Sequence, residues 1–569
     1  MHSRTIERAP FAVLIPLLAA TLPAQPAKPS PVLAAMKAEI TSSMAQFKQQ
    51  QTPPYFLSYE IIENETAVIA GSFGTLIASS PPNRNRNLGI DLRVGDYKLD
   101  NTHPMRGALS NILDTFSNYM VPIDDDADAL RARLWYFTDQ KYKRAIEQLI
   151  AVKTNVKVKA DETDKAGDFS PAKAEVYSEP DVRPLRIDRP AWEDKVRRYT
   201  APFQRYGNIY VANATLNAER QTRWFVSSDG ASIQTAELGY RLSISAFAKA
   251  SDGMELPRNE SFYSSTAEGL PSDDVVLAKV QAMIKDLMAM KNAPVQEAYL
   301  GPAILSPRAT GVIFHEIFGH RVEGQREKRE NQAQTFRDKV GEKVLPEFIS
   351  VYSDPTQRKF GQIELAGFYK FDNEGVKAEK VTVVENGVLK NFLMSRLPVD
   401  GFPVSNGHGR RAVGRNVAGR QSNLLVTAST TVTPEQLKGM LMDEVKRRNL
   451  KYGLYFEDIA GGFTSVGRGV PNYFSVIPTI VYRIYPDGHE ELVRGVDLIG
   501  TALTAFNKIL AADNRMEAFN GMCGAESGFV PVAVGGPGLL FSEVEVQKKP
   551  KSQELSPILA PPFDDKGQL

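Results

Sequence analysis

The chain has 569 residues, more than one ordinary hydrophobic core can organise, so we expect two or more domains. Lys plus Arg number 68 and Asp plus Glu number 67, which leaves a formal net charge of +1. This balance gives no general attraction to nucleic acid or to anionic lipid, so we expect no nucleic-acid partner.

The first residues have the pattern of an export signal. Arg4 and Arg8 precede a short apolar run over residues 11–22, and small residues follow it. We therefore expect a signal peptide over residues 1–24, cleaved after Ala24, and an exported chain that is periplasmic or secreted. The alternative is a disordered N-terminal tail. The run is too short to cross a bilayer core of ~30 Å, and no later segment is long and apolar enough, so we expect no transmembrane anchor.

The N-terminal half predicts a mixed α+β domain. Much of residues 54–100 alternates as half-buried strands do, and strand-like runs resume over residues 209–250. Between them, residues 125–151 are rich in helix formers with apolar residues at helical spacing, and a Lys-rich polar loop is expected to follow. A second helix is expected to begin at Ser272, an N-cap residue followed by two aspartates.

The C-terminal half predicts mainly β structure. Residues 381–397 have the pattern of a hairpin that turns at Glu385–Gly387, and strands are expected on both sides of a turn at Asp487–Gly488. Thr433 followed by Pro434 predicts the start of a helix, because threonine caps helices and proline suits the first helical position.

These elements predict an α+β fold of two domains. The first is a mixed domain over residues 25–298, with an enlarged excursion near residues 82–200. The second is a mainly-β domain over residues 299–569, and it carries a candidate metal-binding helix.

That helix holds two histidines on either side of a glutamate. The pattern is His315-Glu316-x-x-x-His320, one residue longer than the His-Glu-x-x-His motif of zinc peptidases. In a regular helix, positions five apart differ by about 140°, so both imidazoles can reach one metal only if the helix widens or breaks between them. A π-bulge would widen it, and Gly319 would ease such a distortion.

A hydrolytic zinc site usually takes three protein ligands and leaves one position for water. Glu316 is better placed as the general base for that water than as a ligand. Two candidates remain for the third ligand: Glu323, three residues beyond His320, and Cys523, the only cysteine of the chain. The alternative is that both histidines are ordinary helix residues and that Cys523 belongs to the core.

The segment LSPRATGVIFHEIFGHRVEG, residues 305–324, resembles the TldD/PmbA family of metallopeptidases. Residues 371–396, the segment SNGHGRR at 405–411, and the block over 493–544 with its Cys-Gly pair are similar to the family as well. The resemblance covers about residues 295–546. The chain departs from the family pattern in the Gly-Ala-Glu-Ser-Gly that follows the cysteine, in the enlarged excursion and in the export signal.

This resemblance implies a zinc ion bound by His315, His320 and Cys523, with Glu316 as the catalytic base. It makes Glu323 a residue that orients a ligand or the helix. It also implies a two-domain dimer that cuts peptides in an internal cavity, either a homodimer or a heterodimer with a metal-free sister subunit. Because the chain keeps the motif and the cysteine, it resembles the active partner.

His408, in SNGHGRR, could donate a hydrogen bond to a tetrahedral oxyanion; the alternative is a loop histidine beside solvated arginines. We therefore predict a zinc-dependent peptidase that hydrolyses peptides or unfolded polypeptide segments. Two other functions stay open: a non-catalytic exported scaffold or peptide-binding subunit with a structural metal, and a metal-dependent amidohydrolase for small molecules. The glutamate of the motif favours an enzyme, because a structural site needs no base.

Overall fold

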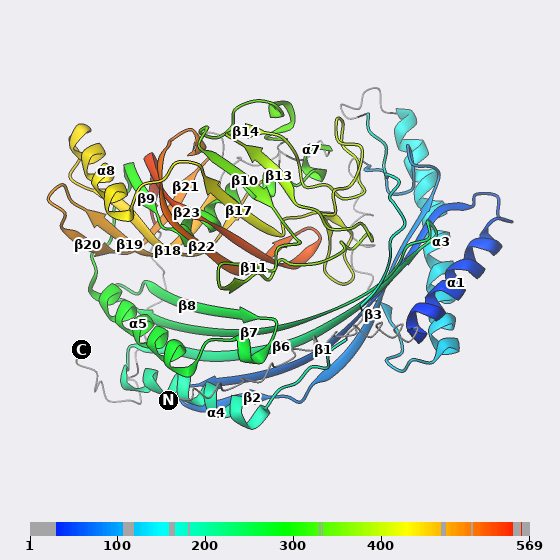
Figure 1. The fold of residues 1–569 in the computed structure, drawn as a ribbon, viewed down its shortest axis with the longest axis horizontal. Coiled ribbons are helices and arrows are strands. Elements are labelled where there is room, and N and C mark those ends of the chain that lie inside the picture. The colour runs from blue at the N-terminus through cyan, green and yellow to red at the C-terminus, as the bar shows by residue number, and fades with distance from the viewer. Residues whose placement is uncertain are drawn as a thin grey trace, which may run out of the picture.

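In the computed structural model, the described residues are 30–105, 119–158, 165–179, 182–328, 332, 334–467, 474–501, 505–549 and 559. They form two β-rich parts with helices at their surfaces, and the C-terminal part rests on a long curved sheet from the N-terminal part (Figure 1). The predicted α+β fold is confirmed. The signal peptide predicted over residues 1–24 lies outside the described residues.

An eight-stranded sheet organises the N-terminal part, in the order β4-β3-β1-β6-β7-β5, with β2 paired to β1 and β8 paired to β7. Long strands form because apolar residues alternate: Leu242, Ile244, Ala246 and Ala248 of β7 are buried, and the residues between them are partly exposed. The strands are β1 Pro54–Ser72, β2 Thr75–Ser79, β3 Asn83–Val94, β4 Tyr119–Met120, β5 Val176–Ser178, β6 Ile209–Ser227, β7 Ser232–Lys249 and β8 Glu255–Ser264.

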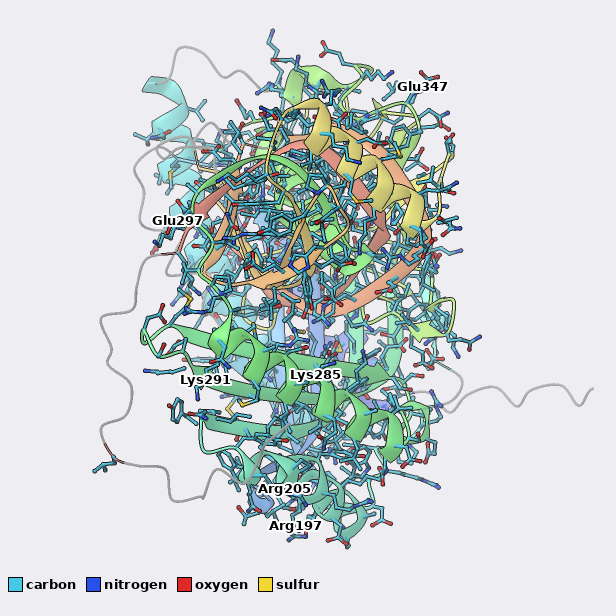
Figure 2. All side chains as sticks on the ribbon, turned by 90° about the vertical axis from the view of Figure 1, so that its left-hand side faces the viewer. Arg197, Arg205, Lys285, Lys291, Glu297 and Glu347 are labelled. Atoms are coloured by element: carbon cyan, nitrogen blue, oxygen red, sulfur yellow. The ribbon has the colours of Figure 1, made fainter. Side chains whose placement is uncertain are left out.

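Helices cover this sheet at both ends. Helices α4 and α5 pack on β6 and β7, whereas α1 and α3 pack together at the opposite end (Figure 1). Arg197 of α4 and Lys285 of α5 lie on the outside of this layer (Figure 2). The helices are α1 Pro31–Phe47, α3 Ala127–Val158, α4 Arg189–Thr200 and α5 Asp273–Asn292, with short 3-10 turns η1 Ala201–Arg205 and η2 Ala267–Gly269.

The helix predicted from Ser272 is confirmed, with Ser272 at the N-cap of α5 and two aspartates in its first turn. Helix α3 continues to Val158, beyond the residue 151 at which the prediction ended it. The Lys-rich stretch that we expected to be a loop therefore supplies the last two turns of this helix. No helix among the described residues is long and apolar enough to span a membrane.

An eleven-stranded sheet organises the C-terminal part, in the order β14-β13-β10-β17-β23-β21-β19-β18-β9, with β20 on β19 and β22 on β23. Strand β23 also pairs with β9, so β9, β18, β19, β21 and β23 close into a ring. The strands are β9 Tyr299–Leu305, β10 Ile349–Ser353, β11 Lys359–Phe360, β12 Ile363–Glu364, β13 Val381–Glu385, β14 Val388–Leu389, β15 Gly409–Arg410, β16 Ala418–Gly419, β17 Asn423–Ala428, β18 Gly453–Thr464, β19 Phe474–Ile484, β20 Glu490–Val493, β21 Val496–Gly500, β22 Ile509–Ala525 and β23 Gly528–Lys548.

Three local predictions in this part are confirmed. Strands β13 and β14 turn at Asn386–Gly387, where both residues have positive φ, although the pairing ends at Leu389 and so is shorter than predicted. Helix α8, Pro434–Arg447, begins with a capping box in which Thr433 and Gln436 exchange hydrogen bonds. Strands β19 and β20 pair across the turn at Asp487–Gly488.

The motif helix lies directly on the sheet that carries the cysteine. Helix α6, Pro307–Ile313, follows β9, and its N-cap Ser306 accepts a hydrogen bond from Ala309 at 3.1 Å. A Cβ on Gly311 would come within 3.1 Å of the Gly535 backbone in β23, so the helix packs on the strand without an intervening side chain. Residue Gly535 pairs with Ala518 of β22, and β22 carries Cys523.

Candidate metal centre

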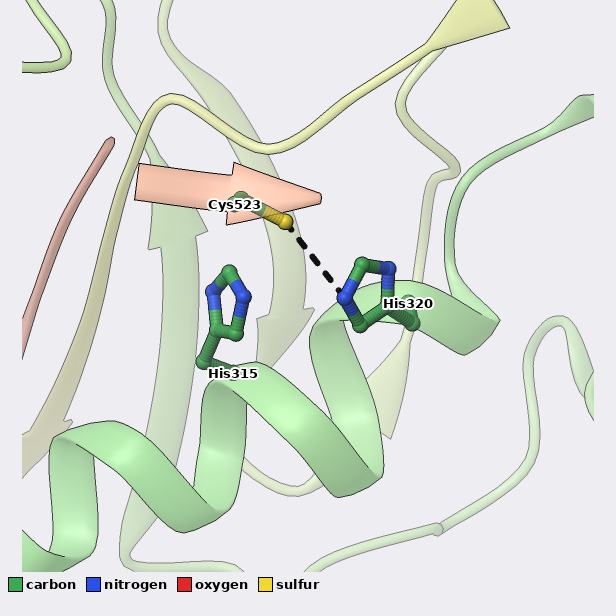
Figure 3. Close-up of side chains that lie close together, drawn as sticks. All are labelled: His315, His320 and Cys523. Carbon is green, nitrogen blue, oxygen red and sulfur yellow. Dashed lines mark hydrogen bonds between the residues drawn. The ribbon is translucent and has the colours of Figure 1, made fainter. Parts of the chain in front are cut away.

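The helix that carries the motif changes its pitch between the two histidines. Residues Phe314–Phe318 form a π-helical turn, η3, and residues Gly319–Arg321 form a tighter 3-10 turn, η4. The widening predicted from the five-residue spacing is therefore confirmed. As a result, the rings of His315 and His320 face the same space, with centroids 5.0 Å apart (Figure 3).

Cys523 completes this cluster from the opposite side (Figure 3). It lies near the end of β22, paired with Val530 of β23, and its side chain is buried. The Cys523 sulfur lies 3.4 Å from Nε2 of His320, and the donor atoms of His315, His320 and Cys523 all lie within 4.8 Å of one another. The structure thus brings together three residues that are far apart in the chain.

The three donors fit a transition metal with a tetrahedral preference. Zinc binds thiolate sulfur at about 2.3 Å and imidazole nitrogen at about 2.0–2.1 Å, so a tetrahedral S–Zn–N edge measures about 3.6 Å. The sulfur-to-Nε2 distance of 3.4 Å is close to this edge. In addition, Nδ1 of His315 is buried without a hydrogen-bond partner among the described residues. Two imidazoles with one thiolate are a donor set that suits zinc.

Glu323 lies behind His320, outside the cluster. Its carboxylate is 3.2 Å from Nδ1 of His320, which leaves Nε2 of the ring directed at Cys523. Arg326 donates to Glu323 at 2.7 and 3.0 Å. Burial would raise the pKa of Glu323, but His320 and Arg326 hold that pKa well below its usual range, so the carboxylate is ionised. Of the two candidates for the third ligand, the structure therefore places Cys523 in the cluster and Glu323 behind it.

Glu316 is the one residue of the 315–320 segment whose side chain is partly exposed. It lies beside Gly462 of β18, where a Cβ would come within 2.9 Å of the Glu316 side chain. The absence of a side chain at Gly462 thus leaves room for this carboxylate. Such partial exposure allows the Glu316 carboxylate to exchange protons with water.

Residues 298–548 match the family model of the PmbA/TldA metallopeptidase C-terminal domain. This range holds the whole cluster together with Glu316 and Glu323. These residues, 298–548, belong to the PmbA/TldA metallopeptidase C-terminal domain family.

Curated relatives named metalloprotease are similar to about half of the chain. A metalloprotease of Methanothermobacter thermautotrophicus is 27% identical over 55% of this chain and 64% of its own length. A metalloprotease of Archaeoglobus fulgidus is 30% identical over 47% of this chain and 58% of its own length. A metalloprotease TldD homologue of Haemophilus influenzae is 25% identical over 46% of this chain and 51% of its own length. The chain thus spans between half and two thirds of the length of these relatives.

Solved structures extend the similarity of the fold to the N-terminal part. TldE from Thermococcus kodakarensis superposes with a TM-score of 0.58 at 14% identity, over 90% of this chain and 100% of that chain. A protein from Thermotoga maritima described as a putative modulator of a DNA gyrase superposes with a TM-score of 0.56 at 14% identity. The superposition covers 90% of this chain and 99% of that chain. The two-part architecture is therefore shared with these two proteins.

His408 does not have the surroundings predicted for an oxyanion donor. It is fully buried, its Nδ1 lies 3.1 Å from the Asn406 carbonyl, and its Nε2 lies 3.1 Å from Oγ of Ser353. Burial lowers the pKa of His408 to about 4, so the ring is neutral, and Nδ1 is the nitrogen that donates. The prediction is wrong because both nitrogens are engaged inside the protein.

The alternative of solvated arginines beside His408 is wrong as well. Arg410 is buried and donates to the carbonyls of Gln421 and Pro531 at 2.6 and 2.8 Å. Arg411 donates to Glu60 of β1 at 2.7 Å and so joins the two parts of the chain. The SNGHGRR segment supports the fold around the site.

Three residues near the cluster were missed by the sequence analysis: Arg321, Arg420 and Gln421. Each is buried, and each contacts a ligand residue or the backbone of the widened turn. Arg321 follows the motif directly, and a positive charge in an apolar helix was a usable signal. Residues 420–421 have no spacing rule that links them to the motif, so only the folded chain reveals them.

Gly319 has a different role from the one predicted. Its φ of −57° and ψ of −46° are open to any residue, so flexibility is not the reason for glycine. A Cβ there would collide with the side-chain amide of Gln421. We predict that Gly319→Ala destabilises the folded protein by about 1–3 kcal/mol, as overpacking does, and lowers its zinc content. Denaturant unfolding and elemental analysis measure the two effects.

Gly439 of α8 provides the matched control, because a Cβ there meets nothing within 4 Å. Gly439→Ala is expected to stabilise the protein by about 0.5–1 kcal/mol, since alanine is the better helix former. Adding Gln421→Ala to Gly319→Ala should restore part of the lost zinc. Full stability and full zinc content in Gly319→Ala alone would contradict the packing argument.

The charges in the metal-free cluster predict that zinc binding releases a proton. Burial would lower the pKa of His320, but Glu323 and Cys523 raise it to about 10. Burial would raise the pKa of Cys523, but both histidines hold it well below the usual value, so the thiolate is already formed. Zinc must therefore displace the proton of His320 below pH 10, and its affinity should rise about tenfold per pH unit up to that point.

Calorimetric titration with zinc at pH 8, in buffers of different ionisation enthalpy, measures this release. We expect about one proton per zinc in wild type. The Glu323→Gln variant should release fewer protons per zinc, because removal of the carboxylate lowers the pKa of His320. Zinc binding that is independent of buffer and of pH between 7 and 9 would rule out a protonated His320.

Proposed function

We propose that this TldD/PmbA chain is an exported zinc-dependent peptidase that hydrolyses peptides or unfolded polypeptide segments. The observation that carries the proposal is the convergence of His315, His320 and Cys523, with the partly exposed Glu316 next to His315 in the chain. The match to a metallopeptidase domain over this region supports it, as do curated relatives named metalloprotease and, in Saccharolobus solfataricus, zinc metalloprotease.

His315, His320 and Cys523 would hold the metal, and Glu323 orients one of them. When bound, zinc lowers the pKa of a water molecule and polarises the scissile carbonyl. Glu316 accepts the proton of the attacking water on a carboxylate oxygen and later delivers it to the nitrogen of the leaving amine. The burial of the two histidines and the cysteine keeps bulk water away from the ligands.

The donor count favours catalysis over a structural role. A structural zinc site is usually closed by four protein ligands, whereas the described residues supply three donors here. The scaffold alternative offers no role for a carboxylate that lies beside the first histidine and reaches solvent. The proposal therefore includes catalysis by this chain itself, with peptides as substrates.

Location and assembly belong to the same proposal. The export signal pattern of residues 1–24 supports a location in the periplasm or outside the cell. Family resemblance supports a dimer, either of two such chains or with a metal-free sister subunit.

The test compares purified mature wild type with Glu316→Gln, Cys523→Ala and the surface control Glu347→Gln, whose side chain is 82% exposed (Figure 2). Wild type and Glu347→Gln should contain about one zinc per chain and cleave unstructured peptides. Glu316→Gln should keep its zinc and lose about 10²–10⁴-fold in kcat, because only the base is removed.

Cys523→Ala should lose both zinc and cleavage, since two imidazoles alone hold zinc weakly. Elemental analysis and a peptide-cleavage assay followed by mass spectrometry give both readouts. Normal cleavage by Glu316→Gln would eliminate the assigned base. Zinc bound in wild type without any cleavage of peptides would favour the scaffold.

A further inference from the structure

Arg420 lies between β16 and β17, and its guanidinium is fully buried against the metal cluster. One arm, Nη2, donates to the sulfur of Cys523 at 3.1 Å and to the Cys523 carbonyl at 2.8 Å. The other arm, Nη1, donates to Oγ of Ser527 at 2.6 Å and to the Gly528 carbonyl at 3.0 Å. A single side chain thus holds the ligand cysteine and the turn that follows it.

The same guanidinium also lies beside Glu323, the carboxylate that contacts the ligand His320. Its Nε lies 3.2 Å from Oε1 of Glu323, and Glu323 contacts Nδ1 of His320. Arg420 therefore bridges the β22–β23 hairpin, which supplies the sulfur, and the carboxylate that fixes the imidazole. Nη1 and Nη2 donate four hydrogen bonds, and Nε forms an ion pair with the carboxylate. Only a planar fork can make these contacts together, so a lysine cannot replace it fully.

The backbone of Arg420 is itself held in place. Its amide donates to the carbonyl of His408 at 2.9 Å, and the neighbouring Gln421 donates from Nε2 to the His315 carbonyl at 3.2 Å. The buried His408 segment and the motif helix thus fix residues 420–421 from two sides. Arg420 is thus a buried charge that contacts Cys523 directly and lies beside the carboxylate that supports His320, while its neighbour Gln421 contacts His315.

We propose that Arg420 is a positioning residue of the metal centre, which sets the place of the Cys523 sulfur and weakens its electron donation to the metal. The proposal rests on the metal site of the proposed function. Its N–H···S hydrogen bond draws electron density from the thiolate, and its contacts with the hairpin turn keep the sulfur opposite the two imidazoles. Losing such a supporting residue typically costs 10–100-fold in metal affinity.

Cobalt(II) loaded into the protein reports both effects without any activity assay. Wild type should show a thiolate-to-cobalt charge-transfer band together with the intense visible bands of a tetrahedral site. Arg420→Met should bind cobalt at least about tenfold more weakly. Its charge-transfer band should move to longer wavelength, because a thiolate without the hydrogen bond is easier to oxidise. Arg420→Lys should lie between the two in affinity.

Arg86→Met is the matched control, because Arg86 is equally buried, in β3 of the N-terminal sheet, and pairs with Glu63 at 2.6 Å. A purely structural loss of a buried arginine lowers stability but leaves the cobalt spectrum unchanged, as expected for this control. If Arg420→Met does not fold, Arg420→Lys carries the test with the same two readouts.

Cobalt affinity and band position equal to wild type in the folded Arg420 variant would overturn the proposal and leave the metal centre intact. A wild-type protein that binds neither cobalt with a thiolate band nor zinc would instead overturn the metal centre and the proposed function with it. The two failures are therefore distinguishable in one titration series.

Discussion

The site depends on one geometric constraint: two histidines five residues apart must present their rings to one point. An α-helix directs such positions about 140° apart, so the helix has to widen at residues 314–318 and tighten again at residues 319–321. Where the pitch changes, backbone carbonyls lose their usual amide partner four residues ahead. Arg321 supplies replacement donors, with Nη1 at 3.2 Å from the Glu316 carbonyl and 2.8 Å from the Ile317 carbonyl. The same nitrogen reaches Oγ1 of Thr464 at 2.7 Å, which ties the widened turn to the end of β18.

Buried charge around the ligands is balanced residue by residue. Glu323 lies between two arginines and an imidazole, and Arg326 extends the network to Glu526 at 3.1 Å. Gln325 donates to the same Glu526, also at 3.1 Å. The Gly-Ala-Glu-Ser-Gly segment, which departs from the family pattern, thus places Glu526 and Ser527 against arginines of this chain. The fold tolerates this departure from the family pattern because the polar side chains of Glu526 and Ser527 hydrogen-bond to buried arginines.

The predictions that succeeded rest on local chemistry, and those that failed depend on tertiary contacts. The start of α5, the capping box of α8 and the Asn386–Gly387 turn follow from neighbouring residues, so the sequence alone was sufficient. The π-turn also followed, because the spacing of two ligands demands it. Cys523 lies 203 residues beyond His320. As the only cysteine it was one of two candidates for the third ligand, and only the family resemblance chose it over Glu323 before the fold was known. His408 was misassigned because a polar Gly-rich segment with two arginines looks exposed in sequence, whereas in the fold its partners are Ser353, Asn406 and Arg420.

The enlarged N-terminal excursion connects to the metal helix through backbone contacts that no pattern could predict. Lys328, at the end of α7 (Gln325–Lys328), donates to the carbonyls of Ala166 and Gly167 at 2.9 and 2.6 Å. Ser170 and Arg396 exchange backbone and side-chain hydrogen bonds, both at 2.8 Å, from the excursion to the C-terminal part. The segment after the second histidine is thus held by the N-terminal part through Lys328, while the turn before it is held by β18 through Arg321. The two sides of the second histidine are therefore fixed by different structural units, because residues 166–167 hold Lys328 and β18 holds Arg321.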